Sequence, residues 1–207
     1  IVRPQTGEIL DCQTFTSKQA GYVIRAICQT GIRPLVYGLI DGRERVSWVA
    51  GNENEGLKHY LSLKKGDRRL RPLKDEEGLY DGEIYYFTCI GEKQELMPLY
   101  QRLCDHKDYH CTLQQEIYRP EYWCEIMPRA ASNANGILRL KSILGCKRII
   151  SFGDAINDLP MCRISDEFYA VANGVDALKT HATAIIPGND EDGVARWLLE
   201  NARLEIS

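Results

Sequence analysis

The last third of the sequence alternates short apolar runs with segments of helical periodicity. The apolar runs are CKRIISF, FYAVAN and TAIIP, and helical segments stand before, between and after them. Strands that alternate with helices form βαβ units, whose strands run parallel in one sheet. The sequence therefore predicts that the strands near residues 148–153, 168–172 and 183–187 are parallel neighbours.

The first 130 residues show a different pattern, with hairpin signals and separate amphipathic helices. A helix with its apolar residues on one face is expected between a cap at Thr16 or Ser17 and a stop at Gly31. Two β-rich runs meet at Asp41-Gly42, which predicts a hairpin. A hairpin-rich α+β region followed by alternating strands and helices predicts two domains.

Composition argues against several classes of partner. The formal charge is −3 and no apolar run approaches the roughly 18 residues of a membrane span, so we expect neither nucleic acid nor a bilayer as the main partner. The cysteines are dispersed without a CxxC pair, which predicts reduced, mostly buried thiols in a cytoplasmic protein. They stand at positions 12, 28, 89, 104, 111, 124, 146 and 162.

The segment CDHKDYHC brings together four side chains of the zinc-ligand types. Its spacing fits no common structural zinc site, and a helix end that runs into a strand would point the side chains in different directions. Surface histidines and packed thiols are the favoured interpretation, with zinc as the alternative. The four residues are Cys104, His106, His110 and Cys111.

A second charged stretch, KKGDRRLRPLKDEEG, carries six basic residues between positions 64 and 74, followed at once by three acidic ones. A nucleic-acid surface would need a larger basic face and aromatic platforms. The stretch is predicted to be a solvated loop.

The segment RIISFGDAINDLPM places acidic and amide side chains directly after a strand whose apolar residues predict that it is buried. In an open α/β sheet, ligands bind beyond the carboxyl ends of the strands. Oxygen ligands suit Mg²⁺, so Asp154, Asn157 and Asp158 are candidate ligands of a magnesium site. The alternative is structural, with Asp158 capping the next helix and Asn157 stabilising the turn.

The same segment resembles the fourth motif of the haloacid dehalogenase-like (HAD) hydrolases, in the Cof-like branch of sugar-phosphate and related phosphatases. The segments YAVANGVDALKTHAT and NDEDGVARWL are similar to C-terminal segments of that branch in order and spacing. The resemblance implies an α/β fold with a Rossmann-like parallel-sheet core and an inserted α+β cap domain. Residues 1–15 and 129–207 would belong to the core, and residues 16–128 would form a cap that determines substrate specificity.

The resemblance also implies Mg²⁺-dependent hydrolysis of a small phosphorylated metabolite. In such enzymes one aspartate attacks phosphorus, and the acidic fourth motif completes the metal site. A cation offsets the repulsion between the anionic nucleophile and the anionic substrate. By position, Asp154 would bind the metal directly, and Asn157 and Asp158 would bind a metal-held water or orient neighbours.

Two features depart from the family pattern. The nucleophile motif DxDG[TS] is absent from the 207 residues, and IVRPQTGEIL resembles the family's segment on the C-terminal side of that motif, so we expect an N-terminally truncated chain that is inactive as written. Asn133 stands where the family has a phosphate-binding lysine. A non-catalytic relative that binds or senses a phosphometabolite is therefore the alternative function. The segment QEIYRPEYWCEI is interpreted as an aromatic-packing hairpin, with substrate contact as the alternative.

Overall fold

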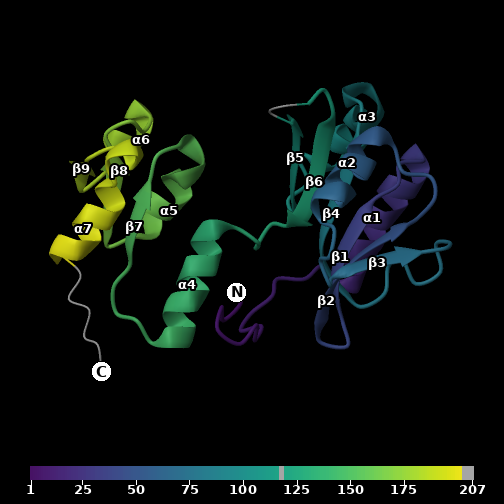
Figure 1. Cartoon of the computed structure of the whole chain (residues 1–207), viewed down its shortest axis with the longest axis horizontal. Coiled ribbons are helices and arrows are strands. Elements are labelled where there is room, and N and C mark those ends of the chain that lie inside the picture. Colours follow the sequence, from purple (N-terminus) through teal and green to yellow (C-terminus); the bar gives the residue numbers. More distant parts are fainter. Residues whose placement is uncertain (117–118, 202–207) are drawn as a thin grey trace. The chain divides into compact units, whose positions relative to one another are not determined.

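The computed structural model describes residues 1–116 and 119–201 and divides the chain into two compact units (Figure 1). Unit 1 combines Ile1–Asp11 with the chain from Ser132 onward, and unit 2 is Cys12–Ala131. Within the described ranges, no helix has the length and apolar character that crossing a membrane requires. The role of residues 16–128 as a specificity domain stays a prediction.

Unit 2 is built on a six-stranded sheet in the order β3-β2-β1-β4-β6-β5. Its strands are β1 (Leu35–Ile40), β2 (Arg43–Val49), β3 (Leu70–Leu73), β4 (Glu83–Gly91), β5 (Tyr109–Gln115) and β6 (Tyr122–Pro128). Its helices are α1 (Ser17–Thr30), α2 (Glu55–Leu63) and α3 (Lys93–Leu103). Residues 117–118, within the segment QEIYRPEYWCEI that is predicted to form a hairpin, lie outside the described residues.

The signals read from the sequence explain where α1 begins and ends. Thr16 and Gln19 form a capping box, because each side chain bonds the other's backbone N–H. Gly31 ends the helix with φ 71°, a left-handed conformation that favours glycine. The helix buries Val23 and Ile27, so the predicted amphipathic helix is confirmed.

The β1–β2 hairpin is also confirmed. Asp41 and Gly42 both have positive φ, 51° and 71°, as a two-residue turn matched to the strand twist requires. The register on either side pairs Ile40 with Arg43 and Val36 with Ser47. Aspartate and glycine tolerate this conformation better than other residues, which is why the turn falls there.

The prediction of a solvated loop for the basic stretch was wrong in part, because β3 runs through it. This strand pairs in parallel with β2 at the edge of the sheet. Acidic neighbours hold Arg71 within the strand and Arg69 directly before it: Arg69 Nη2 lies 2.7 Å from Asp67 Oδ2, and Arg71 Nη2 lies 3.1 Å from Asp81 Oδ2. An edge strand tolerates such charge because one side of it faces solvent.

Two apolar clusters form the core of unit 2. The larger joins α1 and α3 to the sheet, through residues such as Ile27, Leu99 and Phe87. The smaller joins α2 to the sheet, through Leu57 and Ile90. Phe87 and Ile90 on β4 are in different clusters, as expected where alternate residues face opposite sides of a strand.

Unit 1 carries a three-stranded sheet in the order β7-β8-β9. Its strands are β7 (Ile150–Gly153), β8 (Glu167–Val171) and β9 (Ala184–Ile186). Its helices are α4 (Asn133–Leu144), α5 (Leu159–Ile164), α6 (Asp176–Lys179) and α7 (Gly193–Asn201), with short 3₁₀ turns at Ile156–Asp158 and Asn189–Glu191. Both strand pairs are parallel, which confirms the predicted βαβ arrangement.

The remaining packing of unit 1 involves α7 and the first residues of the chain. Trp197 of α7 contacts the rings of Phe152 and Tyr169, with centroids 5.2 and 4.6 Å away. Arg139 of α4 forms an ion pair with Asp11, with Nη1 3.0 Å from Oδ2. Asp192 precedes α7, and its carbonyl oxygen accepts from the Arg196 N–H at 2.9 Å.

Candidate functional site

The candidate site lies where the three parallel strands of unit 1 end. Asp154 follows β7 directly, and the loops after β8 and β9 leave the sheet at the same edge because the strands are parallel. The backbone links the first two loops, since the Val175 N–H donates to the Asp154 carbonyl oxygen at 2.8 Å. This is the edge at which open α/β sheets bind ligands.

Asp158 shapes the first of these loops. Its Oδ2 accepts from the backbone N–H of Asp154 at 3.0 Å and of Ala155 at 3.2 Å. The carboxylate comes so close that a Cβ added to Gly153 would lie 2.7 Å from Oδ2, so only glycine fits there without movement. Asp158 stands at the N-cap position of α5, as the structural alternative expected, but its side chain makes no capping bond to that helix.

Asp154 and Asn157 present their side chains to solvent. Within residues 1–116 and 119–201, neither side chain makes a hydrogen bond or an ion pair with the protein. Charged and amide oxygens that the protein leaves free at a strand end are available to a ligand. Asp158 keeps Oδ1 for the same purpose, because its bonds to the loop use only Oδ2.

These side chains fit a magnesium ion as part of its coordination shell. Mg²⁺ keeps several waters and is commonly held by one or two carboxylates, which Asp154 and Asp158 can supply. Among the described residues, no three His, Cys, Asp or Glu side chains come together as a metal site. The loop therefore offers two carboxylates and the Asn157 amide, and further ligands would be water or substrate oxygens.

A second pair of polar side chains at this edge was missed by the sequence analysis. Asn173, after β8, accepts from the Asn189 backbone N–H at 3.2 Å, and its amide nitrogen donates to Asn189 Oδ1 at 2.5 Å. The amides tie together the loops that follow β8 and β9. The available signal was the asparagine behind each apolar strand, in VANG and IPGND.

Asn133 is the first residue of α4 and is exposed. Ser132 caps the helix, with its hydroxyl accepting from the Asn135 N–H at 3.2 Å. The N-terminus of a helix favours anions because its first N–H groups have no intrahelical partner. Asn133 therefore stands where a phosphate could be bound, with an amide donor and no charge.

The segment CDHKDYHC distributes its candidate zinc ligands over different environments. The His106 ring stacks on Tyr109 with centroids 4.4 Å apart, and His110 is exposed on β5. Cys111 is buried, with its sulfur 3.8 Å from that of Cys124 on the neighbouring strand. All eight cysteines are free thiols. Three are buried, three are half-buried and two are exposed, so the expectation of mostly buried thiols was wrong.

Unit 2 contains an aromatic hollow of about 470 Å³ between α2 and the β5–β6 hairpin. Trp123 and Tyr60 meet edge to face in its wall, with centroids 5.2 Å apart, and Lys64 Nζ lies 5.6 Å from the Tyr60 ring centre. The guanidinium of Arg119 hydrogen-bonds Glu121 and thereby lowers the pKa of that carboxyl. Trp123 belongs to the hairpin for which substrate contact was the alternative interpretation.

Comparison with known proteins decides the family. The model of the family described as haloacid dehalogenase-like hydrolase matches residues 1–198. The chain belongs to the haloacid dehalogenase-like hydrolases. Among curated HAD relatives, it is 39% identical over 121 residues to the 5-amino-6-(5-phospho-D-ribitylamino)uracil phosphatase YitU of Bacillus subtilis, a match that covers 58% of this chain and 45% of YitU.

A second HAD relative carries the same enzyme description. YwtE of Bacillus subtilis is 28% identical over 134 residues, which covers 62% of this chain and 45% of YwtE. The match to this chain therefore spans a little under half the length of these curated relatives.

Solved structures share the fold. A haloacid dehalogenase-like hydrolase from Bacteroides thetaiotaomicron superposes with a TM-score of 0.71 at 19% identity, over 96% of this chain and 72% of the other. A Thermotoga maritima protein gives 0.70 at 21% identity, over 96% and 71%. The expected fold is thereby confirmed: an α/β structure with a small parallel sheet and an antiparallel-rich, cap-like sheet, as in this branch of the family.

Proposed function

We propose that the chain is the metal-binding and substrate-selecting part of a Mg²⁺-dependent phosphatase that acts on a small phosphorylated metabolite. The observation that carries this proposal is the free carboxylate of Asp154 at the end of β7, in a chain that belongs to the HAD hydrolases. The two relatives YitU and YwtE, both named as phosphatases of a phosphorylated metabolite, support the substrate class.

Each residue of the candidate site has a distinct role in this proposal. Asp154 would hold the metal, Asn157 would hydrogen-bond a water of the metal, and Asp158 sets the loop through Oδ2 and would bind the same water through Oδ1. Asn133 and the first N–H groups of α4 bind the phosphate oxygens. When bound, Mg²⁺ neutralises charge on the phosphate oxygens.

The attacking group is not among these residues. Phosphoryl transfer needs a nucleophile in line with the leaving oxygen, and the 207 residues contain no DxDG[TS] motif. We therefore expect the 207-residue chain alone to be inert toward an aryl phosphate. Asn133 supplies no positive charge, so a protein that carries the nucleophile should also turn over slowly.

We also propose that unit 2 acts as the specificity cap, with its aromatic hollow receiving the organic part of the substrate. The support is the lining of the hollow, in which Trp123 and Tyr60 offer ring faces and edges while Lys64 and His59 offer positive or hydrogen-bonding groups. Such a lining suits a planar heterocycle, because aromatic pairs and cation–π contacts both contribute to its binding.

Steady-state turnover of an aryl phosphate by four proteins tests the activity. The four are the 207-residue chain and the same chain joined to any residues that its gene encodes before Ile1, each with Asn133 or with Asn133→Lys. We expect no turnover by the 207-residue chain, and turnover by the extended protein that Asn133→Lys increases. Turnover by the 207-residue chain alone would refute the assignment of the nucleophile.

A non-catalytic phosphometabolite sensor is the second candidate. It is favoured by Asn133, which keeps hydrogen bonding to phosphate and lacks the charge that would stabilise the transition state. An extended Asn133→Lys protein that remains inert but binds a phosphosugar in calorimetry would support the sensor and exclude the phosphatase.

A further inference from the structure

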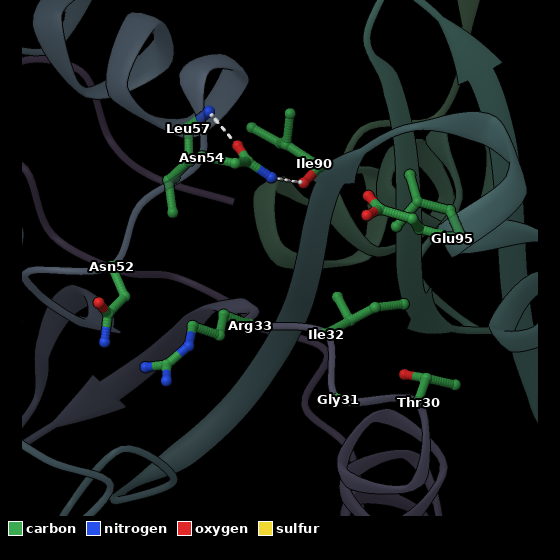
Figure 2. A pocket seen from close by; sticks show the side chains of 10 residues that line it. Thr30, Gly31, Ile32, Arg33, Asn52, Asn54, Leu57, Ile90 and Glu95 are labelled. Carbon is green, nitrogen blue, oxygen red and sulfur yellow. Dashed lines mark hydrogen bonds between the residues drawn. The ribbon is translucent and has the colours of Figure 1, made fainter.

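A separate hollow of about 300 Å³ lies in unit 2, beyond the start of β1 and the end of β4, the two central strands of the sheet. Three connections surround it: the one from α1 to β1, the one from β2 to α2, and the end of β4 with the first turns of α3 (Figure 2). Its volume is at the lower end of the range for small-molecule sites. The aromatic hollow described above has a different lining, so the two are distinct.

The hollow lies far along the sheet from the points where the chain enters and leaves unit 2. After the chain enters at Cys12, the Phe15 N–H donates to the Ile84 carbonyl oxygen at the start of β4. The chain leaves after Pro128, at the end of β6, which is antiparallel to β4 and so ends beside that start. Ile90, which lines the hollow, is six residues beyond Ile84 on β4. At the rise per residue of a β-strand, these two residues are roughly 20 Å apart.

One wall of the hollow is cationic and its donors are unused. Arg33 and Asn52 come from different connections, and Figure 2 shows their side chains pointing toward each other. Within the described part of the chain, neither makes a side-chain hydrogen bond or an ion pair. A guanidinium presents a planar fork of donors that matches a carboxylate, and a neighbouring amide can add a further donor.

The opposite wall carries one carboxylate. Glu95 lines the hollow, and Figure 2 shows its carboxylate directed toward the end of β4 near Ile90. Its Oε2 accepts from the Glu92 backbone N–H at 3.1 Å in a capping box, and its Oε1 accepts from no protein donor within residues 1–116 and 119–201. Glu95 is thus held by the backbone and keeps one oxygen for a cationic group.

Apolar side chains and a braced turn separate these two walls. Ile32, Leu57 and Ile90 line the space between them. The amide of Asn54 fixes this region, since its Nδ2 donates to the Ile90 carbonyl oxygen at 2.7 Å and its Oδ1 accepts from the Leu57 N–H at 2.9 Å. The hollow is therefore preformed, which reduces the ordering that a ligand must impose.

We propose that this hollow binds a small zwitterionic metabolite with a carboxylate at one end, an ammonium group at the other and a short aliphatic chain between them. Arg33 and Asn52 bind the carboxylate, Glu95 Oε1 binds the ammonium group, and the aliphatic chain lies against Ile32 and Ile90. The proposal uses residues of unit 2 alone and is independent of the proposed phosphatase activity.

Heteronuclear NMR titration of the 207-residue chain tests this site. The probes are γ-aminobutyrate and ε-aminocaproate, and the singly charged controls are caproate and hexylamine. We expect at least one zwitterion to shift the Gly31, Asn52 and Gly91 amides and to bind about threefold to fivefold more tightly than either control. No shift by either zwitterion, or equal binding by the controls, would overturn the proposal.

Two substitutions identify which wall binds which charge. The Arg33→Gln variant should bind the zwitterion no more tightly than hexylamine. The Glu95→Gln variant should bind it no more tightly than caproate. Glutamine at position 95 can keep the capping bond to the Glu92 N–H, so α3 should be unaffected. Arg43→Gln, at the far end of β2, is the matched control and should leave binding unchanged. Unchanged binding by both test variants would also overturn the proposal.

Discussion

The backbone N–H of Val175 donates to the carbonyl oxygen of Asp154 at 2.8 Å, which ties the loop after β8 to the candidate metal-binding residue. Asp154 thus has a main chain held from both sides, by this bond and by the bond from its own N–H to Asp158. Its side chain remains free of protein partners in the described ranges. A rigid backbone beneath a free carboxylate is the arrangement that a metal ligand requires.

Replacing Asp154 by asparagine should abolish specific binding of Mn²⁺, used as a paramagnetic substitute for Mg²⁺. The substitution removes the charge of the proposed direct ligand and leaves the loop's backbone bonds in place. Electron paramagnetic resonance of free Mn²⁺ measures the loss. Asp105→Asn, an exposed aspartate of unit 2, should bind Mn²⁺ as the unmodified chain does. Equal binding by both variants would exclude Asp154 as the ligand.

Asp158→Ala should lower the free energy of unfolding by about 1–3 kcal/mol, because two backbone N–H groups lose a charged acceptor. Asp158→Asn keeps an acceptor oxygen and should lose less. Urea denaturation gives both values, and Asn157→Ala is the control, expected within about 0.5 kcal/mol. If the alanine and asparagine variants were equally stable, the bonds to the loop would not be what Asp158 contributes.

Adding a methyl group at Gly153 should displace the Asp158 carboxylate and so disturb the same loop. A Cβ there would lie 2.7 Å from Asp158 Oδ2 and 2.8 Å from the Phe168 ring, so Gly153→Ala should destabilise the fold and weaken Mn²⁺ binding. Gly136→Ala should instead stabilise the fold. A Cβ at this position of α4 meets no other atom, and alanine is a better helix former than glycine by about 0.5–1 kcal/mol. The midpoint temperature of thermal unfolding should therefore fall for Gly153→Ala and rise for Gly136→Ala.

Stability should fall at alkaline pH through Tyr37. Burial, followed by its 2.8 Å hydrogen bond to Tyr60, raises the pKa of this phenol above its usual value. A raised folded-state pKa gives stability that is complete below the unfolded pKa of about 10 and is lost as pH rises above it, because the unfolded chain ionises first. Urea denaturation between pH about 8 and 11 should show this fall, and Tyr37→Phe should reduce it. Tyr100→Phe, outside this cluster, should leave the slope unchanged.

The parts of the fold that were predictable depend on neighbouring residues in the sequence. The ends of α1 follow from Thr16 and Gly31, and the β1–β2 turn from Asp41-Gly42, because caps and turns are local. The β3 strand was missed because the ion pairs of Arg69 and Arg71 that accommodate its charge are visible only after folding.

In the candidate sites, too, only features that depend on neighbouring residues in the sequence could be predicted. Asp154 was identifiable from its place behind an apolar strand. The bracing role of Asp158 was not, since it depends on the path of the backbone from Gly153 to Ala155. The hollow proposed to bind a zwitterion left no signal in the sequence, because Arg33 and Asn52 come from two connections and Glu95 from helix α3, and these meet only in the folded unit.

Unit 2 is one uninterrupted stretch of chain. It enters beside Ile84 at the start of β4 and leaves after Pro128 at the end of β6, and these two points are close because the neighbouring strands β4 and β6 are antiparallel. A segment that is continuous, has its own apolar core and returns close to where it began can be exchanged as a cassette. Recombination could replace it in a single event and leave the Asp154 loop untouched. Lineages could therefore acquire new ligand preferences in this segment while the candidate metal-binding loop stays the same.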